Sequence, residues 1–245
     1  MGDELSRREF LLTGAALTAA TALPARGQAP AATRVAKGTV ILFQGDSITD
    51  CGRNRDSADP NSAGALGTGY PLLVASAVLA AHPTRDLKLY NRGVSGNKVP
   101  DLQQRWTPDA INLKPDVLSI LIGVNDFWHK LDHGYNGTVQ DYEQQYAALL
   151  QTTRDALPHV RLIVLEPFVL RTGAVDARWF PEFDQRRAAA ARVAARAHAA
   201  FIPLQAIFNQ RARTAPPEYW AADGVHPTPA GHAVIAEQWR RAANL

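Results

Sequence analysis

The chain contains 245 residues, of which 46% are hydrophobic and 20% are charged. This balance is typical of a folded globular domain and excludes a disordered chain. The formal net charge is only +3, and the basic residues are interspersed with acidic ones, so we expect no nucleic-acid partner.

The first segment that the sequence predicts is an export signal. Residues 6–11 (SRREFL) contain paired arginines, and the weakly apolar residues 11–23 that follow are too few to span a bilayer. Small residues at 29–31 offer a cleavage site. The pattern resembles a twin-arginine translocation (Tat) signal, and the alternative is an ordinary N-terminal helix. We therefore expect a signal peptide over residues 1–31 and an exported, periplasmic or extracellular, domain over residues 32–245, without stable membrane insertion after the signal is removed.

Short apolar runs alternate with helical patterns along the rest of the chain. Strands are predicted over residues 39–44, 87–91, 116–122, 160–165 and 201–204. Helices are predicted over residues 72–81, 99–110, 139–157, 182–199 and 228–243. Nearly continuous apolar strands separated by helices indicate a parallel sheet covered on both faces. Ligands of such sheets bind beyond the carboxyl ends of the strands, so reactive side chains are expected in the segments that follow them.

Three candidate residues follow the first three predicted strands. In residues 45–49 (GDSIT), Ser47 lies at a strand-to-helix turn that can present its hydroxyl to solvent and leave backbone N–H groups free for an oxyanion. Gly96 follows the second strand and can let a ligand approach its N–H group closely. Asn125 follows the third strand and can donate from its side-chain amide. Each has an ordinary alternative: a helix N-cap, a simple turn and an Asx-turn.

A fourth candidate motif lies near the C-terminus, where Asp223 precedes His226 by three positions. A carboxylate at this spacing can hydrogen-bond the imidazole, fix its tautomer and stabilise its charged form. The other ring nitrogen then remains free to take a proton from a serine hydroxyl.

Together, the four motifs resemble the four blocks of the SGNH (GDSL-type) hydrolase family, in order and in place. The resemblance implies a flavodoxin-like three-layer α/β/α sandwich of about five parallel strands. It also implies a catalytic triad of Ser47, Asp223 and His226, with an oxyanion hole formed by Ser47, Gly96 and Asn125. The family's reaction is acyl transfer through a covalent intermediate on the serine, and it needs no metal or cofactor.

Other side chains are assigned from position alone. We expect Asp46 to be a hydrogen-bond acceptor supporting the nucleophile. Trp128, Trp220 and Arg171 are candidates for substrate binding, with core packing as the equal alternative for aromatic residues, Trp179 included.

The sequence does not favour two other chemistries, a metal site and a cysteine nucleophile. His129 and His133 have the spacing of metal ligands on a helix, but their loop-like surroundings make a helix doubtful and no third ligand is evident. Cys51 has no paired base in the sequence, and as the only cysteine it cannot form an intrachain disulfide.

The sequence favours a short acyl group, because it contains no long apolar lid helix. Residues 44–50 (QGDSITD) and 220–227 (WAADGVHP) most resemble the xylan-esterase-like branch of the family. This resemblance implies the leading interpretation, removal of O-acetyl groups from a carbohydrate, with a small-molecule or polysaccharide ester as the partner. The alternatives are a lipolytic esterase or lysophospholipase and, in another class, a catalytically silent carbohydrate-binding protein.

Overall fold

Five short parallel strands form the centre of the fold. The computed structural model describes residues 35–245, so the segment expected to be a signal peptide lies outside the described residues. The strands pair in the order β2-β1-β3-β4-β5, which is that of flavodoxin-like proteins. This confirms the predicted fold class. Their bounds are Val40–Gly45 (β1), Lys88–Asn91 (β2), Val117–Leu121 (β3), Arg161–Leu165 (β4) and Ala200–Ile202 (β5).

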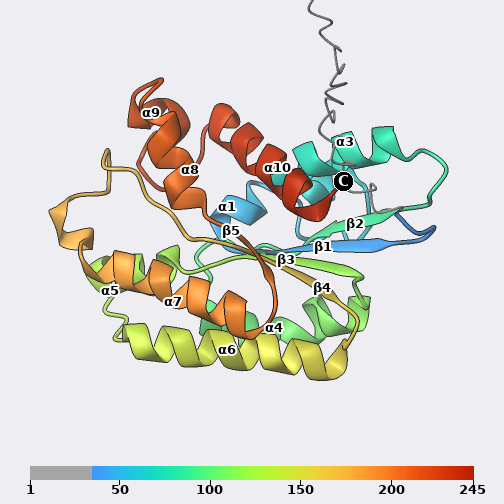
Figure 1. Cartoon of the computed structure of the whole chain (residues 1–245), viewed down its shortest axis with the longest axis horizontal. Coiled ribbons are helices and arrows are strands. Elements are labelled where there is room, and N and C mark those ends of the chain that lie inside the picture. The colour runs from blue at the N-terminus through green and yellow to red at the C-terminus, as the bar shows by residue number, and fades with distance from the viewer. Residues whose placement is uncertain (1–34) are drawn as a thin grey trace, which may run out of the picture. The chain divides into compact units, whose positions relative to one another are not determined.

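Helices cover both faces of this sheet (Figure 1). One face is covered by α1 (Ser47–Asp50), α2 (Ala63–Leu66), α3 (Tyr70–Ala81), α8 (Leu204–Arg211), α9 (Pro217–Trp220) and α10 (Pro229–Ala243). The other is covered by α4 (Val99–Asp109), α5 (Val124–Asp132), α6 (Val139–Ala156) and α7 (Glu182–Arg196). Among the described residues, no helix combines the length and apolar character needed to cross a bilayer.

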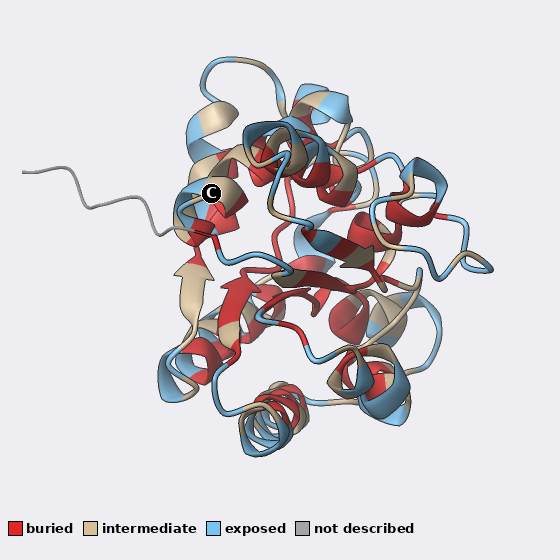
Figure 2. Ribbon diagram, turned by 90° about the vertical axis from the view of Figure 1, so that its right-hand side faces the viewer, coloured by how far each residue is buried: buried red, intermediate tan, exposed pale blue. Residues whose placement is uncertain are grey.

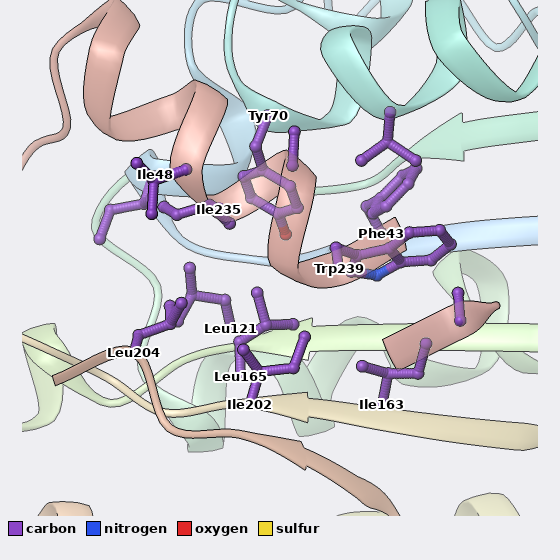
Figure 3. Close-up of a cluster of buried hydrophobic side chains, with 14 of the residues drawn as sticks. Phe43, Ile48, Tyr70, Leu121, Ile163, Leu165, Ile202, Leu204, Ile235 and Trp239 are labelled. Carbon is purple, nitrogen blue, oxygen red and sulfur yellow. The ribbon is translucent and has the colours of Figure 1, made fainter. Parts of the chain in front are cut away.

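The hydrophobic core forms one large cluster on each face of the sheet and a third, smaller cluster around α5, and the buried residues concentrate between the layers (Figure 2). On the α10 side, the Phe43 ring lies 5.2 Å from Trp239 and 5.7 Å from Tyr70 (Figure 3). Trp239 Nε1 donates to Ser119 Oγ at 2.8 Å, so its one polar atom is satisfied inside the core. Burying an aromatic side chain of this size contributes roughly 1.5–3 kcal/mol, which holds the layers together without a disulfide.

The helices α2, α5, α8 and α9 were not predicted from the sequence, and two of them, α5 and α8, differ from a specific expectation. His129 lies in α5, which continues to Asp132, so the expectation that the segment around His129 is not helical is wrong. The glycines and asparagine that prompted it come after the helix ends and do not interrupt it. In α8, Leu204 begins a helix instead of ending a strand, because β5 already stops at Ile202.

Candidate active site

The nucleophile candidate lies at the first turn beyond β1. Ser47 is the first residue of α1, and Asp46 caps this helix by accepting the Ile48 N–H at 3.0 Å. The Asp46 side chain is buried, whereas Ser47 is partly exposed. Within residues 35–245, no hydrogen bond engages the Ser47 N–H, so the turn presents a hydroxyl and a free amide together.

A histidine and an aspartate from the C-terminal part of the chain reach this serine. Ser47 Oγ lies 2.8 Å from His226 Nε2, and His226 Nδ1 lies 2.6 Å from Asp223 Oδ2. Asp223 Oδ1 also accepts the backbone N–H of His226 at 2.7 Å and that of Val225 at 2.9 Å. Burial alone would raise the pKa of Asp223, but these hydrogen bonds outweigh it and hold the pKa below its usual value. The carboxylate therefore stays charged and keeps a proton on Nδ1, which leaves Nε2 as the acceptor for the serine.

The loop that carries this pair is fixed on both sides. Leu170 N donates to Gly224 O at 2.8 Å, and Ala174 N donates to Asp223 O at 2.9 Å. On its C-terminal side, Thr228 is the N-cap of α10 and accepts the Gly231 N–H. The segment after β4 and the last helix thus hold the imidazole in place.

The second oxyanion candidate lies on a turn that packs directly against the nucleophile turn. Val94 N donates to Gly45 O at 3.0 Å. Gly93 has no room for a side chain, since a Cβ there would lie 2.4 Å from the Asp50 nitrogen. Gly96 has a φ of +82°, which favours glycine, and no residue of the described chain accepts its N–H. This amide is therefore available to a ligand.

The third candidate, Asn125, comes from the start of α5 and is 5% exposed. Its Nδ2 donates to Asn97 O at 3.1 Å, which ties it to the turn that contains Gly96. The second Nδ2 hydrogen remains for another acceptor. Three segments that follow β1, β2 and β3 are thus joined at one edge of the sheet.

Of the residues expected to bind substrate, Trp128 lies beside the imidazole, with ring centroids 5.9 Å apart. Trp220 is only 9% exposed and donates from Nε1 to Ala215 O, so the expectation of a substrate-stacking surface is corrected here to core packing. Trp179 is also fully buried, and its Nε1 donates to Ala174 O. Arg171 is exposed, and its guanidinium lies 3.8 Å from the centre of the Phe180 ring in a surface pocket whose lining includes no triad residue.

Several contacts at this edge could not be read from the sequence. Arg105 of α4 donates to Asn97 Oδ1, Arg92 O and Asp109 Oδ2, each at 2.8 Å, and so clamps the turn that carries Gly96. The only sequence signal was the i,i+4 pair of Arg105 and Asp109, which indicates no more than a helix.

The cysteine and histidines that were set aside lie apart from the triad's hydrogen bonds. Cys51 Sγ is 3.4 Å from His232 Nε2, so a partner exists that the sequence did not reveal. His232 Nδ1 accepts the Tyr70 N–H, which places the neutral ring's proton on Nε2 and leaves no base for the thiol. His129 and His133 have ring centroids 4.7 Å apart, but within residues 35–245 no three potential ligands gather around a metal position.

The Asp46 carboxyl yields a prediction about stability. Burial raises its pKa from 3.8 to about 7. The folded protein therefore keeps a proton that the unfolded chain releases, and stability falls as pH rises between these two values. An Asp46→Asn variant keeps the oxygen that caps α1 but never ionises. The variant should therefore become more stable relative to wild type as pH rises: the difference in unfolding free energy, variant minus wild type, should be roughly 2–3 kcal/mol more positive at pH 8 than at pH 5, as measured by urea denaturation. If the difference in unfolding free energy between Asp46→Asn and wild type did not change with pH, Asp46 would not be neutral in the folded protein.

A hydroxyl, an imidazole and a carboxylate joined by hydrogen bonds beyond the carboxyl ends of a parallel sheet define a serine-hydrolase type of site. The chain belongs to the GDSL-like lipase/acylhydrolase family, whose model matches residues 43–234. It is a carboxylic ester hydrolase. Residues 4–24 match the signal sequence of the twin-arginine translocation pathway, so the chain carries a signal for export across the membrane. These findings confirm the family and the export signal expected from the sequence.

Known proteins resemble the chain over most of its length. An acetylxylan esterase from Geobacillus stearothermophilus is 37% identical over 210 residues, which is 85% of this chain and 95% of the esterase. A crystal structure of that esterase has a TM-score of 0.77 at 34% identity and covers 87% of this chain and 97% of its own. A crystal structure of a protein described as a GDSL-like lipase, from Parabacteroides merdae, has a TM-score of 0.83 at 47% identity, with coverage of 85% and 96%.

Catalytic mutants of the Geobacillus enzyme have also been solved, with a serine, an aspartate or a histidine replaced by alanine. The serine and the histidine replaced there are separated by 179 positions, as are Ser47 and His226. The aspartate precedes the histidine by 3 positions, as Asp223 precedes His226.

Proposed function

We propose that this chain is an exported serine esterase that removes O-acetyl groups from carbohydrates through an acyl-enzyme on Ser47. The observation that carries the proposal is the unbroken hydrogen-bonded series from Ser47 Oγ through the His226 ring to the Asp223 carboxylate. We also propose that the signal peptide ends at residue 31, which gives a mature domain of residues 32–245.

In the acylation step, His226 Nε2 takes the proton of Ser47 as Oγ attacks the carbonyl carbon of the ester. Charge moves to the carbonyl oxygen, which the N–H groups of Ser47 and Gly96 and the amide of Asn125 stabilise. The imidazolium, held by Asp223, then donates its proton to the leaving alcohol oxygen as the ester C–O bond breaks.

Deacylation repeats these roles with water. His226 takes a proton from a water molecule as the water oxygen attacks the acyl carbon. The bond between the acyl carbon and Ser47 Oγ then breaks, His226 returns the proton to Oγ, and acetate leaves. The half-exposed side chains of Asp223 and His226 leave room for a carbohydrate chain above the site and for water to enter.

Two observations support a short acyl group on a carbohydrate. The relative that covers nearly the whole domain is an acetylxylan esterase. Trp128 lies next to the imidazole, where its ring can stack on a sugar while limiting the space for a long acyl chain. Arg171 remains a candidate only for a more distant part of a polymeric substrate, since its pocket is separate from the triad.

Substrate preference tests this function. We expect the purified protein to release acetate from acetylated xylo-oligosaccharides. We also expect kcat/KM for p-nitrophenyl esters to fall by about tenfold or more from acetate to octanoate. The reason is that an acyl site limited to a short group should disfavour each extra methylene. Octanoate hydrolysed as well as acetate would favour a lipolytic esterase. Binding of xylo-oligosaccharides without hydrolysis of any ester would indicate a silent carbohydrate-binding protein.

A further inference from the structure

The carboxylate of Asp50 joins the two turns that carry oxyanion donors. Asp50 is the last residue of α1, three positions after Ser47, and its side chain is 3% exposed. Its Oδ2 accepts the backbone N–H of Ser95 at 2.9 Å, the Ser95 hydroxyl at 2.8 Å and a hydrogen bond from Arg55 Nη2. One oxygen atom therefore receives three donors from two different segments.

The charge on Asp50 is stable in this setting. Burial alone would raise its pKa, but the hydrogen bonds from Arg55 and Ser95 outweigh burial and hold the pKa below its usual value. Hydrogen bonds to a charged acceptor are shorter and roughly twice as strong as neutral ones. The Ser95 turn is thus attached to α1 by charge-assisted bonds, although Ser95 itself is exposed.

This attachment determines where the Gly96 amide lies relative to the nucleophile. Ser95 directly precedes Gly96, and the N–H of Gly96 belongs to the same peptide unit as the Ser95 carbonyl. On the other side of the turn, Asn97 is held by Asn125 and Arg105. With Asp50 in place, the Gly96 amide is fixed from both directions.

We propose that Asp50 is a positioning residue that fixes the position of the Gly96 amide of the oxyanion hole relative to Ser47 on α1. The inference depends on the proposed function, because it gives the Gly96 N–H a role in stabilising the transition state. Donors stabilise an oxyanion only within about 2.7–3.1 Å of the position that it will occupy. A displacement of about 0.5 Å is enough to weaken such a site.

The test compares three variants on p-nitrophenyl acetate. Asp50→Asn keeps an acceptor oxygen but removes the charge that strengthens the bonds from Ser95 and Arg55, so we expect kcat to fall roughly 10- to 100-fold with KM changed less than about threefold. Ser95→Ala removes one of the three bonds and should lower kcat less. Glu166→Gln is the matched control, since Glu166 is a buried carboxylate that accepts a backbone N–H from Gln205 and a bond from Arg187, but it touches no triad residue. It should retain kcat.

A second readout separates positioning from general loss of structure. Methylboronic acid forms a tetrahedral adduct with a catalytic serine and places an oxygen in the oxyanion hole. Its inhibition constant should rise in Asp50→Asn by about the factor lost in kcat/KM, and should stay unchanged in Glu166→Gln. Equal losses of kcat in Asp50→Asn and Glu166→Gln, or boronate inhibition unchanged in Asp50→Asn, would overturn the proposal. A Ser47→Ala variant with full activity would instead overturn the proposed function, so the two failures are distinguishable.

Discussion

Replacing Ser47 with alanine is expected to lower kcat on p-nitrophenyl acetate by about 10⁴- to 10⁶-fold, because it removes the atom that forms the acyl-enzyme. We do not expect Cys51 to replace it. Cys51 is close in sequence, but its sulfur contacts His232, whose Nε2 carries a proton and cannot act as its base. The residual rate should therefore come only from substrate binding and the oxyanion donors.

The Ser47→Ala variant should remain folded, because Ser47 is partly exposed and, among residues 35–245, its side chain hydrogen-bonds only to His226. We expect its melting temperature to stay within about 2 °C of wild type, since a surface substitution usually changes stability by no more than about 0.5 kcal/mol. A folded variant that still turned over the substrate at more than a few per cent of the wild-type rate would show that another group is the nucleophile.

Replacing Asn125 with alanine should reduce kcat by roughly 10²- to 10³-fold while KM changes by less than about threefold. The side-chain amide is proposed to stabilise the charge that develops on the carbonyl oxygen, so its loss affects the transition state more than the bound substrate. Asn125→Asp keeps the shape of the side chain but puts a carboxylate beside Asn97 O and the developing oxyanion. We expect this variant to lose at least as much kcat as the alanine variant.

Unfolding measurements provide the control for Asn125, because its bond to Asn97 O also contributes to stability. Breaking a bond of this kind costs about 1 kcal/mol, which is too little to unfold the domain. If kcat stayed at the wild-type level in a folded Asn125→Ala variant, the amide would have no part in catalysis.

The location of the site could be predicted from the sequence because of one property of parallel sheets. Their strands end at the same edge, so motifs that follow successive apolar runs converge there even when they are far apart in the chain. The contact between residues 47 and 226, which are 179 positions apart, depends on this convergence and on the short Asp223–His226 spacing. The three central strands, β1, β3 and β4, were predicted from continuous apolar runs that are buried on both faces.

Features that depend on tertiary contacts escaped prediction. Asp50 and Arg105 are ordinary polar residues in sequence, and only the fold brings their side chains to the turn around Gly96. Trp220 is close to the triad loop in sequence, yet its indole turns into the core, because position along the chain does not determine which way a side chain points. The short helix α5 was obscured by turn-forming residues that lie after its end.

The most direct test of the account is to identify the residue that a fluorophosphonate modifies, by peptide mapping and mass spectrometry. The reagent forms a stable bond with an activated serine and mimics the acylation step. We predict one adduct per chain, on Ser47, with loss of esterase activity in proportion to labelling and with labelling strongly slowed in His226→Ala. An adduct on any other residue while Ser47 stayed unmodified, or full activity after Ser47 had been labelled, would contradict the central claim.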